Sequence, residues 1–255
     1  MRLPRLSGTI ERRILLNFRI RPEFVARLLP APFAPVTVRD WAIGGICLIR
    51  LARVRPALVP GFMGMRSENC AHRFAVQWRE GATTRRGVYI TRRDSNQWLN
   101  AVAGGRLFPG VQHWARFQVD ETSSSWAVRV ESTNPPMQVA VAVHLCPTLN
   151  QDSVFSSLSE ASSFFRASAD GYSPSHAPGR FDGMHLQCDD WNVEALRVER
   201  AESTFFEDPH YFPRGSVQLD CALLMRDLRH QWLGLADVCC DSECPDTVGL
   251  LPGHA

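Results

Sequence analysis

The chain has 255 residues, enough for one large domain with a sizeable core. Its net charge of +2 and the lack of any run of like charges argue against a nucleic-acid-binding surface. All 28 basic residues are arginine, which excludes a Schiff base on a lysine side chain and a lysine general base.

The N-terminus lacks the apolar segment of a signal peptide, and no apolar run approaches the roughly 20 residues that span a bilayer. We therefore expect a cytoplasmic protein without a membrane partner, in which the eight cysteines are reduced. Four potential zinc ligands, Cys239, Cys240, Cys244 and His254, cluster near the C-terminus, but paired C-x-x-C spacing is missing. We expect no metal, no cofactor and a disordered tail over residues 237–255.

Strand-like runs dominate the chain. The expected elements of the first half are a strand at Glu11–Ile20, a helix at Pro22–Leu29, strands at Val36–Val38, Ala42–Val54, Ser67–Arg79 and Gly87–Thr91, and a helix at Ser95–Ala103. Those of the second half are a meander of His113–Val119, Trp126–Glu131 and Met137–Leu145, a helix at Ser157–Arg166, a loop at Asp170–Gly183, and strands at Val193–Ser203 and Ser216–Arg226.

Because strands outnumber helices and do not alternate with them, we expect one mainly β (α+β) domain over residues 1–236. The favoured architecture is an antiparallel β-barrel or cone with two or three short peripheral helices.

The strand at Ser67–Arg79 carries the most informative side chains. Successive residues point to opposite faces, and the set that contains Glu68 and His72 is the more apolar one. This pattern predicts that both side chains point inward, where a carboxylate must be paired, hydrogen-bonded or protonated. Such a group is a candidate for a functional site, but an ion pair that merely joins two strands, and a core histidine, are equally ordinary interpretations.

Several segments resemble a bacterial family of domains of unknown function (DUF) with the acetoacetate-decarboxylase-like fold. They are RILLNFRI at 13–20, SEN at 67–69, GVYI at 87–90, SN at 95–96, GGRLFPG at 104–110 and CALLMRD at 221–227. The resemblance extends over about residues 5–235 and implies an antiparallel β-cone with a central cavity. In the decarboxylases a cavity glutamate precedes the segment similar to Gly105–Val111, and Glu68 lies upstream of that segment in the same way.

One departure from the decarboxylases is decisive for the chemistry. Those enzymes carry two adjacent lysines after an aromatic–proline pair, and one of them forms the Schiff base. Here Phe108 and Pro109 are followed by Gly110 and Val111, so Schiff-base decarboxylation is excluded. The resemblance therefore implies the fold, and function has to be argued from the site.

Three hypotheses follow. The first is an enzyme with lyase-like or hydrolase-like acid–base chemistry on a small anionic carbonyl or carboxylate compound. In it the catalytic residues are Glu68 and His72, and the candidate substrate-binding residues are Arg66, Arg73, Tyr89, Arg92, Arg93 and Arg106. The second is a binding protein that uses the same cavity for a small-molecule ligand without catalysis. The third is a structural role, in which arginines of the two central strands pair across the interface of a homo-oligomer.

Overall fold

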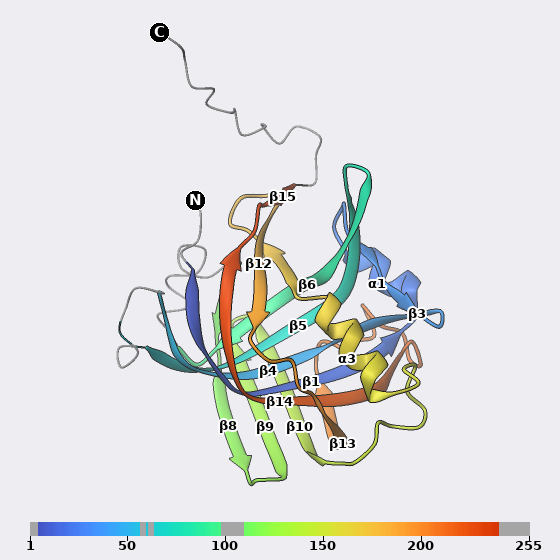
Figure 1. Ribbon diagram of the computed structural model, residues 1–255. Coiled ribbons are helices and arrows are strands. Elements are labelled where there is room, and N and C mark those ends of the chain that lie inside the picture. The colour runs from blue at the N-terminus through green and yellow to red at the C-terminus, as the bar shows by residue number, and fades with distance from the viewer. Residues whose placement is uncertain (1–4, 57–59, 61–63, 98–109, 240–255) are drawn as a thin grey trace.

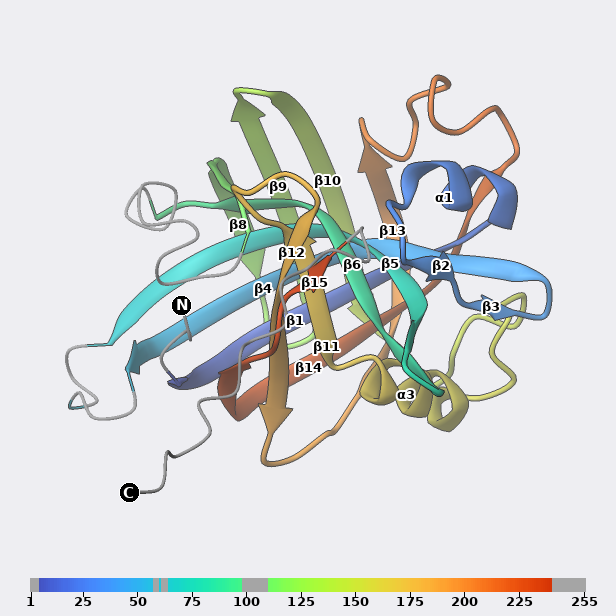
Figure 2. The same cartoon turned by 90° about the horizontal axis from the view of Figure 1, so that it is seen from above.

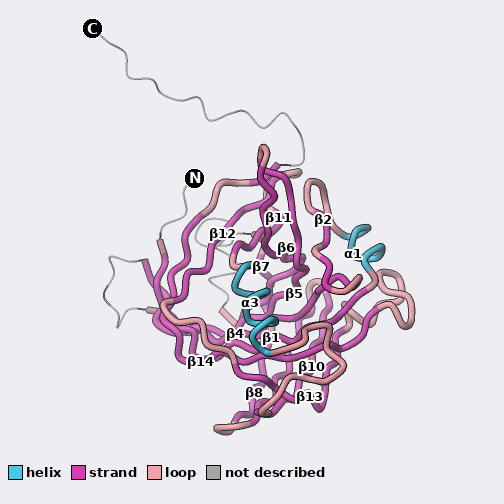
Figure 3. The backbone as a smooth tube through the Cα atoms, turned by 45° about the vertical axis from the view of Figure 1, so that its right-hand side comes forward, coloured by secondary structure: helices cyan, strands magenta, loops and turns pink. Residues whose placement is uncertain are grey.

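The computed structural model describes residues 5–56, 60, 64–97 and 110–239, and strands make up most of this part of the chain (Figure 3). The first half contains β1 (Leu6–Ile20), α1 (Pro22–Leu28), β2 (Ala34–Pro35), β3 (Thr37–Val38), β4 (Trp41–Pro56), β5 (Met65–Glu80) and β6 (Thr83–Ser95). The second half contains β7 (Gln112–Trp114), β8 (Arg116–Glu121), β9 (Ser125–Thr133), β10 (Pro136–Leu145), α3 (Leu158–Ala167), β11 (Asp170–Pro174), β12 (Arg180–Cys188), β13 (Glu194–Ser203), β14 (Val217–Gly234) and β15 (Val238–Cys239).

The mainly β prediction is confirmed. The described strands belong to one sheet, in which the path β12–β11–β6–β5–β4–β1–β14 returns to its start because β12 also pairs with β14. Most pairs are antiparallel, but β6 pairs in parallel with β7 and β11. Neither helix of the described chain is long and apolar enough to cross a membrane.

The long strands β1, β4, β5 and β14 lie side by side and are covered on both faces (Figures 1 and 2). Strands β9 and β10 cover one face, and their valines pack with side chains such as Ile14 and Phe74 in the largest core cluster. Helix α3 covers part of the other face, where Phe165 packs with Leu15 and Leu223. Because both faces are buried, apolar character alone does not distinguish them.

Both described helices match the sequence-based expectation within one residue. Helix α1 begins at Pro22, whose missing N–H costs nothing in the first turn. Helix α3 begins after Ser157, whose Oγ accepts a hydrogen bond from the Glu160 N–H at 3.1 Å. The helix expected at Ser95–Ala103 lies largely outside the described residues.

The loop expected at Asp170–Gly183 is wrong, because β11 and the first part of β12 form there. The glycines that suggested a loop instead allow close packing: a Cβ on Gly183 would lie 2.5 Å from the ring of Tyr172. The tail was expected to be disordered from residue 237, but β15 at Val238–Cys239 pairs with the start of β12. The remaining zinc candidates, Cys240, Cys244 and His254, lie outside the described residues.

Candidate functional site

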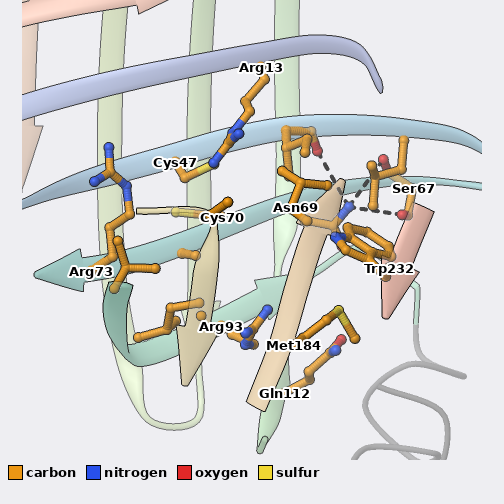
Figure 4. A pocket seen from close by; sticks show the side chains of 18 of the residues that line it. Arg13, Cys47, Ser67, Asn69, Cys70, Arg73, Arg93, Gln112, Met184 and Trp232 are labelled. Atoms are coloured by element: carbon orange, nitrogen blue, oxygen red, sulfur yellow. Dashed lines mark hydrogen bonds between the residues drawn. The ribbon is translucent and has the colours of Figure 1, made fainter. Parts of the chain in front are cut away.

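A pocket of about 140 Å³ opens between the long strands and the layer formed by α3, β11 and β12 (Figure 4). Most of its wall on β5 comes from one strand face, which carries Ser67, Asn69, Ala71 and Arg73. We call it the arginine pocket because three arginines from different strands line it: Arg13 of β1, Arg73 of β5 and Arg93 of β6.

Arg73 is almost fully buried, with 3% of its surface exposed. Its Nη2 donates to Oδ1 of Asn17 at 2.8 Å, and its guanidinium carbon lies 5.0 Å from the ring centre of Phe165. Its Nε and Nη1 have no hydrogen-bond partner among the described residues. Burial lowers the pKa of Arg73 to about 10, so the guanidinium stays charged at neutral pH.

Gly45 of β4 makes this arrangement possible, because it stands opposite both Asn17 on β1 and Arg73 on β5. A Cβ at this position would lie 2.3 Å from the carbonyl oxygen of Leu16 and 3.3 Å from Asn17 Oδ1. The absence of a side chain at Gly45 thus leaves room for the contact between Asn17 and Arg73.

A β-bulge determines which arginine of β6 enters the pocket. Val88 and Ile90 line the pocket, and regular alternation would continue with Arg92. However, His72 pairs with Arg92 and Arg73 pairs with Ile90, so the intervening residue of β6 is extra. The bulge shifts the alternation and brings Arg93 into the pocket wall, where its Nε donates to Ser173 Oγ at 2.9 Å.

Arg13 contacts sulfur atoms on neighbouring strands. Its Nε donates to the Sγ of Cys47 at 3.5 Å, and its Nη1 lies 3.9 Å from the Sδ of Met225. Its guanidinium carbon is also 6.0 Å from the ring centre of Trp191. Figure 4 shows the Arg13 side chain reaching down to the Cys47 sulfur from the strand above it.

No carboxylate among the described residues forms an ion pair with Arg13, Arg73 or Arg93. Asp94 borders the pocket, but its two carboxylate oxygens accept hydrogen bonds from Arg92. The described part of the pocket therefore carries an excess of positive charge. Burial also lowers the pKa of Arg93 to about 10, so this guanidinium too is charged at neutral pH.

Glu68 lies on the opposite face of β5 and does not line the pocket. Its oxygens accept hydrogen bonds from Arg12 Nη2 at 2.6 Å and from Arg50 Nε, and the same two arginines bind Glu121. We call these four residues the balanced cluster because two carboxylates face two guanidinium groups. The two arginines that pair with Glu68, Arg12 and Arg50, are not among the arginines that the sequence analysis named as candidates.

Glu121 joins the end of β8 to the long strands through this cluster. Burial raises the pKa of its carboxyl group, but hydrogen bonds from Arg50 and Arg12 lower that pKa by more, so it lies below its ordinary value. With 12% of its side chain exposed, Glu68 fits the description of a carboxylate that links strands. This is the structural interpretation that the strand pattern had left open.

His72 is fully buried beside Phe205 and Phe206, on the face away from the pocket. Its Nε2 lies 3.3 Å from the Oγ of Ser203, while Nδ1 has no partner among the described residues. Burial, followed by the charge of Arg92, lowers the pKa of His72 to about 3. The imidazole is therefore neutral at physiological pH.

The other predicted substrate-binding residues are dispersed. Arg66 is exposed and pairs with Glu11 at 2.8 Å. Tyr89 is buried in an aromatic cluster with Phe33. Arg92 binds Asp94, and Arg106 lies outside the described residues. Of the six candidates, the pocket brings together Arg73 and Arg93.

Sequence reasoning missed Arg13 and Cys47. A signal was present for Arg13. This residue directly precedes the apolar run Ile14–Leu16 in β1, and a charged side chain at such a position must find a polar environment. Cys47 gave no signal of its own, since a single cysteine in an apolar strand is typical of a buried thiol.

Solved structures with a similar fold were compared with the chain. An acetoacetate decarboxylase from Legionella pneumophila has a TM-score of 0.57 at 8% identity and covers 92% of this chain and 88% of its own. An acetoacetate decarboxylase-like enzyme from Sphingomonas wittichii has a TM-score of 0.57 at 9% identity. The match covers 92% of this chain and 94% of that enzyme. An enduracididine biosynthesis enzyme complexed with pyruvate has a TM-score of 0.54 at 10% identity, covering 93% and 90%.

At these identities the likeness establishes the acetoacetate-decarboxylase-like fold alone. No curated protein matches the sequence significantly. A family model described as "Uncharacterized conserved protein" matches residues 8–218, most of the chain. The chain therefore belongs to that family, DUF2071, and has an acetoacetate-decarboxylase-like, mainly β fold.

Proposed function

We propose that the protein binds a small anionic carbonyl or carboxylate compound in the arginine pocket, within a cone-like sheet. The observation that carries this proposal is the group of three guanidinium groups that line one pocket without an ion-pair partner among the described residues. A buried charge without a partner is costly, and a bound anion removes that cost.

The pocket also suits a carboxylate in size and in geometry. Its volume of about 140 Å³ is enough for a molecule of a few heavy atoms with some water. The Nε and Nη1 of Arg73 have no hydrogen-bond partner among the described residues, and Nη2 donates to Asn17, so a bound anion could accept a hydrogen bond that the protein leaves unmade. The structurally similar enzyme complexed with pyruvate supports 2-oxo carboxylates as the first ligands to test.

Acid–base chemistry by Glu68 and His72 remains a prediction, and the contacts described above favour binding over it. Glu68 is paired with two arginines outside the pocket, and His72 also lies on the face of β5 away from the pocket. Cytoplasmic location and assembly into a homo-oligomer likewise remain predictions.

Thermal unfolding with added anions tests the proposal. We expect pyruvate to raise the Tm in a saturable way, because a ligand that binds only the native state stabilises it by about 2.7 kcal/mol at 100 times its Kd. Acetone at the same concentration, and chloride at the same ionic strength, are the neutral and ionic controls.

Arg73→Met removes the charge that the ligand would neutralise. We expect the variant without ligand to be as stable as the wild type within about 1 kcal/mol, because a buried charge without a partner disappears. Its Tm should no longer respond to pyruvate. Arg66→Met is the matched control, because Arg66 is exposed and is not among the residues that line the pocket. An unchanged pyruvate response in Arg73→Met, or none in the wild type, would refute the proposal.

A further inference from the structure

Cys47 is a thiol on the wall of the arginine pocket. Only 7% of the residue is exposed, yet its Sγ accepts a hydrogen bond from Arg13 Nε at 3.5 Å and borders the cavity. Arg73 and Arg93 line the same pocket as this sulfur, so all three pocket arginines lie around one cavity that the thiol borders.

A second, independent observation points to a ligand beside this thiol. Arg73 is 97% buried and lines the same pocket, where its Nε and Nη1 donors have no partner among the described residues. An anion that accepts these hydrogen bonds would lie in the cavity that the sulfur borders. A carbon atom next to that anion would then be placed close to a nucleophile.

We propose that Cys47 is a nucleophile that forms a covalent bond with small carboxylates carrying an electrophilic carbon beside the carboxylate group. This inference rests on the proposed function, because the arginines must first hold the carboxylate. With iodoacetate as the probe, the thiol proton passes to solvent and the thiolate attacks the methylene carbon. The S–C bond forms as the C–I bond breaks, and iodide leaves with the bonding electron pair, so no oxidant or reductant is needed.

Four other described thiols, those of Cys70, Cys146, Cys188 and Cys221, differ from Cys47 in their surroundings. Burial and then the charge of Asp94 raise the pKa of Cys70 well above its ordinary value, although this residue also borders the pocket. Burial likewise raises the pKa of Cys188 and Cys221. Cys146 lies outside the pocket, and its thiol donates to the carbonyl oxygen of Thr148 at 2.6 Å. Cys146 therefore serves as an internal control.

The test compares alkylation by iodoacetate and by iodoacetamide, which have the same leaving group but differ in charge. The full-length protein is treated with each reagent, and mass spectrometry of its peptides gives a rate for each cysteine. At Cys47 we expect iodoacetate to react at least about tenfold faster than iodoacetamide, since clefts of one charge sign raise association rates by 10–10³. At Cys146 we expect no preference for the anion.

Three further measurements sharpen the result. Pyruvate should slow alkylation of Cys47 by iodoacetate, and Arg13→Met should bring the ratio of the two rates towards that of Cys146. If Arg13→Met does not fold, 0.5 M KCl with the wild type provides the same test, because salt screens the attraction of the cavity for the reagent. Cys47→Ser should lose the labelled peptide, while the two alkylation rates at Cys146 stay unchanged.

Failure of this inference differs from failure of the proposed function. If pyruvate raises the Tm but Cys47 reacts equally with both reagents, or with neither, the arginine pocket binds anions and the nucleophile assignment is wrong. If pyruvate has no effect on the Tm and iodoacetate has no advantage at Cys47, both proposals are wrong.

Discussion

Two groups of arginines lie on opposite faces of the same sheet. Arg12 and Arg13 are adjacent in β1, yet Arg12 belongs to the balanced cluster with Glu68, whereas Arg13 lines the arginine pocket. Alternation along the strand separates them. In the balanced cluster every carboxylate faces a guanidinium, while the described part of the pocket has three guanidinium groups and no carboxylate paired with them.

This difference in charge balance determines which of the two sites is available for a ligand. In the balanced cluster the protein already supplies both charges, so a ligand would have to displace an existing pair. In the pocket one sign of charge is missing, and the ligand can supply it. Arginines that lack a carboxylate partner therefore indicate the binding site better than Glu68, the paired carboxylate that the sequence pattern had singled out.

The largest effect is expected from Glu68→Ala. The substitution leaves Arg12, which is 3% exposed, with a single remaining carboxylate, and breaking a buried pair costs about 3–5 kcal/mol. Urea unfolding measures the loss. The increase in Tm with pyruvate should persist, because Glu68 does not line the pocket. A variant that kept its stability and lost the pyruvate response would contradict this division between the two groups of arginines. It would show that Glu68 takes part in ligand binding.

A smaller effect is expected from acidification, through His72. Its folded-state pKa of about 3 lies below the ordinary 6.5, so the unfolded chain binds a proton first as the pH falls. The contribution of the neutral His72 to the free energy of unfolding is fully present above pH 6.5 and is lost progressively as the pH falls from 6.5 to 3. Between pH 7 and pH 5 the loss is about 2 kcal/mol.

Urea unfolding of the wild type and of His72→Gln at both pH values isolates this contribution. His230, whose pKa burial lowers to about 4, acts in the same direction and remains in the variant. The variant should therefore lose less stability than the wild type on acidification. Equal losses would mean that His72 is accessible to protons in the native state, which would favour its predicted catalytic role.

The smallest effect is expected from Arg66→Met. The ion pair between Arg66 and Glu11 is exposed, and such pairs contribute about 0–1 kcal/mol. Both the stability and the Tm response to pyruvate should remain close to those of the wild type. A lost response would place Arg66 in the binding site, as the sequence had predicted, and would extend the site beyond the arginine pocket.

Much of the fold was predictable because local signals agree with it. Pro22 and Ser157 mark the starts of the two described helices, and alternation marks the long strands. Strands β11 and β12 were not predictable, because Gly171 and Gly183 serve tertiary packing while resembling loop residues. These strands complete the pocket wall, so the error about them also concealed the position of the pocket.

The site was predictable only in part. Arg73 and Arg93 were among the candidates, but the cavity was assigned to the wrong face of β5. The inference assumed that the more apolar face borders the cavity, which holds when the other face is solvated. In this sheet both faces are covered, and the more apolar one packs densely against β9 and β10 while the more polar one borders the pocket.

The bulge in β6 has a consequence for aligning related chains. Thr91 is the extra residue, with no Cα partner in β5. A chain without Thr91 would pair regularly and would still bring Arg93 to the pocket. A chain that kept Thr91 without the bulge would bring Arg92 instead and would separate it from Asp94. An alignment gap misplaced by one position in this strand would therefore assign the third pocket arginine to the wrong column.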